Sequence, residues 1–143
     1  MNRKDFIRQC GFACLGAAGL STLISSCTSM KQVQTSIVDN KLQVPLNAFI
    51  VSAGKYRRYI IARHDSLNYP IVVYRNTAID YTALLLRCSH QYNELNVNGE
   101  LLSCSAHGSE FTTKGEVVTG PAEEKLRSFP VTIDAQNLLI HLV

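Results

Sequence analysis

The segments Cys88-Ser89-His90 and Cys104-Ser105-Ala106-His107-Gly108-Ser109 carry most of the information in this sequence. They place two thiols and two imidazoles in a C-x-H and a C-x-x-H arrangement. Side chains this close in sequence can converge on one site when a strand ends in a loop. Such a set could hold one tetrahedral zinc ion, or a two-iron cluster with two Cys on one iron and two His on the other. The spacing alone leaves both interpretations open.

The rest of the chain is predicted to form short strands. Runs of β-branched or aromatic residues are bounded by turn residues, and Asn98-Gly99 is a strong hairpin signal because both residues tolerate positive φ. The ordered part is expected to begin at 41–46, and the expected strands after it are 56–62, 70–74, 83–87, 94–97, 101–103, 110–112, 116–118, 129–133 and 138–143. The pattern predicts an all-β domain of several small antiparallel sheets over residues 41–143.

Length and charge limit the possible functions. A chain of 143 residues allows one domain. Its formal net charge is +3, and the first ten residues hold three cations against one carboxylate, which leaves about +1 for the remainder. We therefore expect no nucleic-acid partner.

Residues 1–26 are typical of an export signal. A basic start precedes an apolar stretch at 10–24 that is too short and too rich in glycine for a transmembrane helix. The stretch ends in Leu23-Ile24-Ser25-Ser26-Cys27, which resembles a bacterial lipobox with Cys27 as the lipidation site. A signal peptide cleaved nearby and an uncleaved anchor are the alternatives. Asn2-Arg3-Lys4-Asp5-Phe6-Ile7 also resembles a twin-arginine motif with Lys4 replacing the second arginine, so the export route stays open.

The five cysteines divide between the signal and the motif. Cys10 and Cys14 lie in the signal and Cys27 is the expected lipid site, which leaves Cys88 and Cys104. An exported domain therefore has no further pair for a structural disulfide. The polar residues 27–40 are expected to form a flexible tether between the membrane and the domain.

The sequence flanking the two loops resembles the Rieske family over residues 41–143. The matching segments are Ile71-Val72-Val73, Arg87-Cys88-Ser89-His90, Cys104 to Phe111, Gly115-Glu116-Val117-Val118 and Gly120-Pro121-Ala122. The resemblance implies a Rieske-type domain with the cluster-binding loops at one tip and a [2Fe–2S] cluster as cofactor. Cys88 and Cys104 would bind the inner iron. His90 and His107 would bind the outer iron, where electrons enter or leave.

The chain differs from the iron-sulfur subunits of cytochrome bc complexes, which it otherwise resembles. Their two loops are joined by a disulfide, whose positions are Asn93 and Ala106 here. Ser109 matches a serine that tunes the cluster, whereas Phe111 replaces a tyrosine and has no hydroxyl. Hydrogen bonds to sulfur stabilise the reduced cluster. We therefore expect a potential below the quinol-oxidising members, within the Rieske range of about −150 to +300 mV.

These features predict one-electron transfer in an exported, membrane-tethered protein on the periplasmic side of the bacterial cell envelope. It would serve a respiratory or oxidoreductase system as an electron-transfer component and not as a catalyst on its own, with a redox protein or quinol as partner. Two alternatives remain. One is a small redox subunit of a specific exported oxidoreductase, and the other is a zinc-stabilised binding module without redox activity.

Overall fold

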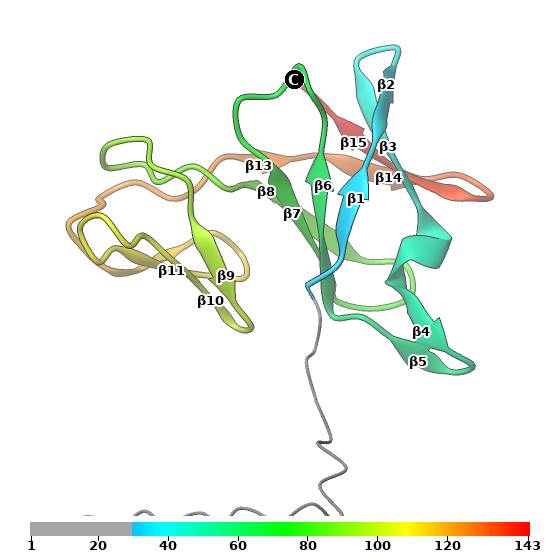
Figure 1. Ribbon diagram of the computed structural model, residues 1–143, viewed down its shortest axis with the longest axis horizontal. Helices are drawn as coiled ribbons and strands as arrows, with labels where there is room; N and C mark the ends of the chain where they lie inside the picture. Colours follow the sequence, from blue (N-terminus) through cyan, green and yellow to red (C-terminus); the bar gives the residue numbers. More distant parts are fainter. Residues whose placement is uncertain (1–29) are drawn as a thin grey trace, which may run out of the picture.

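The computed structural model describes residues 30–143, so the expected signal at 1–26 and Cys27 lie outside the described residues. The strands are β1 (Gln32–Gln34), β2 (Ser36–Val38), β3 (Lys41–Pro45), β4 (Ile50–Ser52), β5 (Lys55–Tyr56), β6 (Tyr59–Arg63), β7 (Ile71–Arg75), β8 (Tyr81–Leu85), β9 (Asn96–Asn98), β10 (Leu101–Ser103), β11 (Glu110–Thr112), β12 (Val117–Thr119), β13 (Ser128–Phe129), β14 (Val131–Ile133) and β15 (Asn137–His141), and a 3-10 turn, η1, spans Leu46–Phe49 (Figure 1). Within these residues no helix has the length and apolar content needed to cross a membrane. The expected all-β fold is confirmed.

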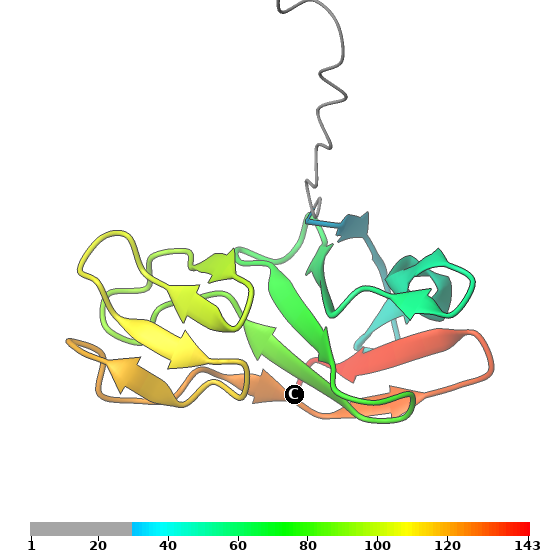
Figure 2. The same ribbon diagram turned by 90° about the horizontal axis from the view of Figure 1, so that it is seen from below.

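A five-stranded sheet of order β1-β6-β7-β8-β13 occupies the middle of the fold. Figure 2 shows its strands between the β12-β11-β10-β9 sheet on one side and the β14-β15-β3-β2 sheet on the other. In the latter, β15 pairs with β3 in antiparallel register, so residues near both ends of the described chain are hydrogen-bonded neighbours. The hairpin β4–β5 forms a separate two-stranded sheet.

The central strand β7 is buried on both faces. Successive side chains of a strand point to opposite faces of its sheet. Ile71 and Val73 accordingly belong to one hydrophobic core, whereas Val72 and Tyr74 belong to the other. All four are at most 1% exposed. This explains why residues 71–74 form a continuous apolar run instead of an alternating one.

Each outer sheet completes one of the two cores. The first core joins the central sheet to β3 and β15 through Leu42, Val44, Leu138 and Ile140. The second joins it to the β9–β12 sheet, and its members include Leu102, Phe111, Cys88 and Cys104. The central sheet therefore supports both lobes of the molecule, one built around each core.

The expected flexible tether at 27–40 is wrong for residues 32–38, which form β1 and β2. β1 pairs in parallel with β6, and β2 pairs in antiparallel with β3. Thr35, between the two strands, donates from both its amide and its hydroxyl to the Arg63 carbonyl, at 2.9 and 2.7 Å. The sequence did not reveal these strands because each has only three residues, lies at the edge of its sheet and leaves two of its three side chains exposed.

Three further details differ from the sequence expectation. The sequence did not indicate η1 and the β4–β5 hairpin. The expected strand at 83–87 ends earlier, because β8 stops at Leu85. The expected strand at 129–133 divides into β13 and β14, which belong to different sheets. Pro130 separates them, and proline has no amide hydrogen with which to continue a ladder.

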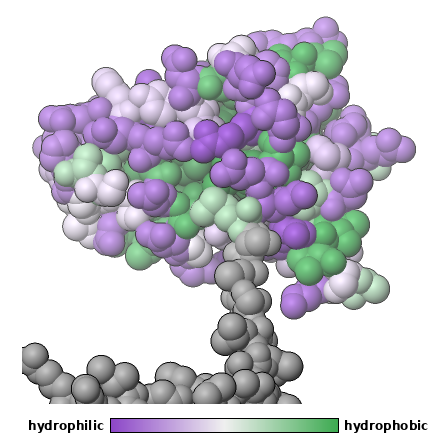
Figure 3. Space-filling view, viewed as in Figure 1, coloured by the Kyte–Doolittle hydropathy of each residue, from purple (hydrophilic) through white to green (hydrophobic). Residues whose placement is uncertain are grey.

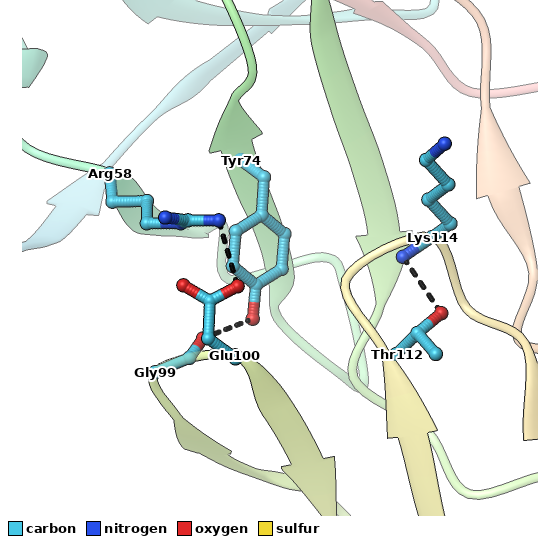
Figure 4. A network of polar contacts seen from close by, with 6 residues as sticks. All are labelled: Arg58, Tyr74, Gly99, Glu100, Thr112 and Lys114. Carbon is cyan, nitrogen blue, oxygen red and sulfur yellow. Dashed lines mark hydrogen bonds and ion pairs between the residues drawn. The ribbon is translucent and has the colours of Figure 1, made fainter. Parts of the chain in front are cut away.

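Polar contacts join the β9–β10 turn to the central sheet (Figure 4). The Tyr74 hydroxyl donates to the Gly99 carbonyl at 3.2 Å, and Arg58 forms an ion pair with Glu100 at 2.7 Å. Burial raises the pKa of the Tyr74 phenol above its ordinary value, so the hydroxyl remains a donor. The ion pair is exposed on both sides and stabilises the fold little. The buried hydroxyl is therefore the more important contact.

Tyr74→Phe should lower the free energy of unfolding by about 1 kcal/mol, because it removes a hydrogen bond without changing the packing of the ring. Tyr59→Phe is the matched control. Its ring lies 5.5 Å from that of Tyr74, and its hydroxyl has no hydrogen-bond partner in residues 30–143. Urea denaturation of both variants measures the difference. Equal stability of the two variants would contradict a role for the Tyr74 hydroxyl.

Candidate metal centre

The first loop follows β8 and is closed at its base by backbone hydrogen bonds. The Cys88 amide donates to the Asn93 carbonyl at 2.8 Å, and the Tyr92 amide donates to the Cys88 carbonyl at 2.9 Å. An antiparallel bridge between Arg87 and Glu94 precedes this closure. The loop thus returns the chain to its starting point within six residues, from 88 to 93.

The second loop joins β10 to β11 and repeats the same closure. The Cys104 amide donates to the Ser109 carbonyl at 2.8 Å, and the Gly108 amide donates to the Cys104 carbonyl at 2.9 Å. The fifth residue has a positive φ in both loops, 60° at Tyr92 and 82° at Gly108. The two loops therefore present their cysteines at equivalent positions of one turn.

The four predicted ligands divide by depth. Cys88 and Cys104 are 1% and 2% exposed and belong to the second core. His90 and His107 are exposed, and their rings lie 5.0 Å apart at 90° to each other. The structure thus brings one histidine from each loop together at the surface and buries one cysteine from each loop beneath.

The segment 120–126 holds both loops from the side. The Ser89 hydroxyl donates to the Glu124 carbonyl at 2.6 Å, and the Ser109 hydroxyl accepts from the Ala122 amide at 3.0 Å. The segment contains Gly120-Pro121-Ala122, one of the stretches that resemble the Rieske family. The contacts of Ser89 and Ser109 bring this segment beside both ligand loops.

The two predicted tuning residues are fully buried. Ser109 has one hydrogen bond to Ala122 in which it accepts, so its own hydroxyl hydrogen is available to another acceptor. Phe111 lies opposite Leu102 in the β10–β11 ladder and belongs to the second core.

Tyr92, in the first loop, has a backbone conformation that its residue type does not predict. Its exposed ring lies under the Arg87 guanidinium, 4.6 Å from the ring centroid. A bulky residue with positive φ is uncommon, because its Cβ approaches the backbone. The signal that could have revealed this conformation is its alignment with Gly108, four residues after the cysteine in each loop.

The donor set fits a [2Fe–2S] cluster with mixed ligation. Such a cluster takes two thiolates on one iron and two imidazoles on the other. Within residues 30–143, no three or more His, Cys, Asp and Glu side chains lie close enough to hold a single metal ion. The described cysteines are not joined in a disulfide, so both thiols are available as ligands.

The family model described as the Rieske [2Fe-2S] domain matches residues 50–130. The chain belongs to the Rieske family. The Rieske family predicted from the flanking sequence is therefore confirmed, and so is the predicted [2Fe–2S] cofactor. Membership also implies electron transfer through the cluster, so the zinc-stabilised module is set aside.

The chain is also similar to individual proteins. A cytochrome b6-f complex iron-sulfur subunit from Synechococcus sp. (strain JA-2-3B'a(2-13)) is 32% identical over 69 residues, which cover 47% of this chain and 40% of the relative. A solved naphthalene 1,2-dioxygenase is 20% identical, with a TM-score of 0.55 over 73% of this chain and 26% of that chain. The plasma membrane Rieske protein of Synechocystis PCC 6803 is also 20% identical, with a TM-score of 0.47 over 71% and 85% of the two chains. The dioxygenase match shows that this chain shares its fold with part of that protein.

Ser109→Ala should destabilise the protein by about 1–3 kcal/mol, because it leaves the buried Ala122 amide without a partner. Ser105→Ala, an exposed position in the same loop, is the control and should change stability little. Urea denaturation monitored by circular dichroism distinguishes the two. A Ser109→Ala variant as stable as the control would show that the segment at 120–126 is held by other contacts.

Proposed function

We propose that this Rieske protein is an exported one-electron carrier whose cluster is held by Cys88 and Cys104 on one iron and by His90 and His107 on the other. The observation that carries the proposal is the burial of one thiol from each loop beneath two exposed imidazoles that lie 5.0 Å apart. The bound cluster supplies one-electron redox chemistry.

The surroundings of the four ligands suit this role. The buried cysteines lie among apolar side chains that exclude water from the thiol side of the site. The exposed histidines leave the opposite side open to a partner. Backbone hydrogen bonds fix the base of each loop, and the contacts of Ser89 and Ser109 hold both loops against residues 120–126. This arrangement keeps the ligands in place when the charge of the site changes.

The tuning residues support a moderate potential. We propose that the Ser109 hydroxyl donates toward the sulfur side of the site, since its oxygen already accepts from Ala122. Phe111 has no hydroxyl to add a second donor. Fewer donors stabilise the reduced, more negative state less, and the midpoint potential should be correspondingly lower.

The cellular context is part of the proposal. Residues 1–26 would serve as the export signal and Cys27 as the lipid attachment site, so that the domain remains on the periplasmic side of the membrane. The matched segment covers only 40% of the cytochrome b6-f subunit. We therefore do not infer that this protein belongs to a complex of that kind. A redox protein or quinol of a respiratory or oxidoreductase system is the proposed partner.

Electron paramagnetic resonance of the full-length protein, reduced with dithionite, tests the ligand set. The expected result is a rhombic [2Fe–2S] signal with the low average g of mixed Cys and His ligation. Cys104→Ala and His107→Ala should abolish it. His141→Ala is the control, because this ring bonds Thr132 at 2.9 Å in the opposite lobe. A protein that holds zinc and no labile sulfide would overturn the proposal.

Phe111→Tyr should raise the midpoint potential. A new hydroxyl that favours the reduced state by about 1 kcal/mol corresponds to roughly 40 mV for one electron. Phe129→Tyr, in the other core, is the matched control and should leave the potential unchanged. Redox titration followed by the resonance signal gives both values. An unchanged or lower potential in Phe111→Tyr would contradict the tuning role of this position.

A further inference from the structure

The β4–β5 hairpin exposes apolar side chains beside the place where the described chain begins. Ile50 and Val51 are each 48% exposed, Tyr56 is 50% exposed and Met30 is 45% exposed. Figure 3 shows a hydrophobic patch on this hairpin, close to the start of β1. Large exposed apolar groups gathered in one place mark a surface that contacts something other than water.

A groove joins the hairpin to the first residues of the domain. It has a volume of about 410 Å³, and its lining includes Lys31, Val33, Ile50 and Arg57. The hairpin and the beginning of β1 are therefore two sides of one surface. A partner that covers the hairpin would also cover the start of the domain.

The charge of this surface has one sign. Lys31, Lys55 and Arg57 surround the apolar groups, and none of them forms an ion pair within residues 30–143. The sequence contains no Asp or Glu at 30–38 or at 41–64. A cationic rim around apolar side chains complements a bilayer with anionic headgroups.

The distance along the chain from Cys27 limits where this surface can lie. β1 begins at Gln32, five residues after Cys27. A fully extended chain of that length reaches about 18 Å. Because Gln32 is paired with Ile61 in the central sheet, the chain gains no further reach from β1. A lipid on Cys27 would hold this surface next to the bilayer.

We propose that the β4–β5 hairpin, together with Met30 and Lys31, is a membrane-docking surface. Ile50 and Val51 enter the headgroup region of the bilayer, and Lys31, Lys55 and Arg57 contact the phosphates of anionic lipids. The inference rests on the proposed lipidation of Cys27. In Figure 1 the hairpin and the β9–β12 sheet lie at opposite ends of the long axis, so docking leaves the ligand loops open to a partner.

A single tryptophan can test this contact, because the sequence contains none. The full-length chain with Val51→Trp is purified from membranes and reconstituted into vesicles of phosphatidylcholine and phosphatidylglycerol with brominated acyl chains. Its emission should fall at least about twofold relative to unbrominated vesicles, because interfacial side chains reach the acyl boundary. Val118→Trp is the matched control at 53% exposure on β12, and its emission should not change. Absent or equal quenching would overturn the proposal.

Charge reversal tests the choice of lipid. Lys31→Glu combined with Lys55→Glu in the Val51→Trp chain should reduce the quenching, because each lost cation weakens the contact with anionic headgroups about fivefold. Unchanged quenching would overturn the electrostatic part of the proposal. An emission shift that depends on protein concentration without vesicles would assign the patch to a second copy of the chain instead.

Two measurements on the same vesicles separate this inference from the proposed function. A persistent [2Fe–2S] resonance signal with no quenching of Val51→Trp defeats the docking surface alone. A missing signal in the parent chain defeats the electron-transfer proposal, whatever the quenching shows. Mass spectrometry of the N-terminal peptide reports lipid on Cys27, and its absence removes the length limit and overturns the docking proposal.

Discussion

The burial of β7 on both faces is the constraint on which the rest of the structure depends. Ile71 and Val73 fill one core, whereas Val72 and Tyr74 fill the other. Because neighbouring side chains point in opposite directions, a shift of one residue in the register would exchange the two sets. The lobe that carries the ligand loops and the lobe built on β3 and β15 are therefore aligned through the same few side chains.

Within the site, the proposed ligands are arranged by depth, from the core to the solvent. Cys88 and Cys104 are part of the hydrophobic interior, whereas His90 and His107 meet at the surface. Identical backbone closures produce this order in both loops. In each loop the amide of the cysteine bonds a carbonyl five residues later, and the residues between these two positions face the solvent. The thiol therefore lies inside and the imidazole outside. The segment at 120–126 then prevents the two loops from separating.

Much of this architecture could be predicted from the sequence. The two loops that carry the proposed ligands were expected at the ends of strands, and the Asn98-Gly99 hairpin follows from its turn chemistry. β1 and β2 could not be predicted, because edge strands of three residues with mostly exposed side chains are too short to show a strand pattern within the polar segment 27–40. The division at Pro130 depends on which sheet β13 and β14 each join, and contacts with residues distant in sequence decide this. The positive φ of Tyr92 could be predicted only by aligning the first loop with the second, which has Gly108 at the equivalent position.

The pairing of β15 with β3 has a consequence for the order of folding. Residues 86–126, which form the lobe with the ligand loops, are contiguous, and their sheet is built from hairpins between neighbours in sequence. The other lobe closes only when residues 137–141 reach residues 41–45. Local contacts form faster than contacts between distant residues. During synthesis from the N-terminus, the ligand loops therefore emerge before the strand that completes the opposite core.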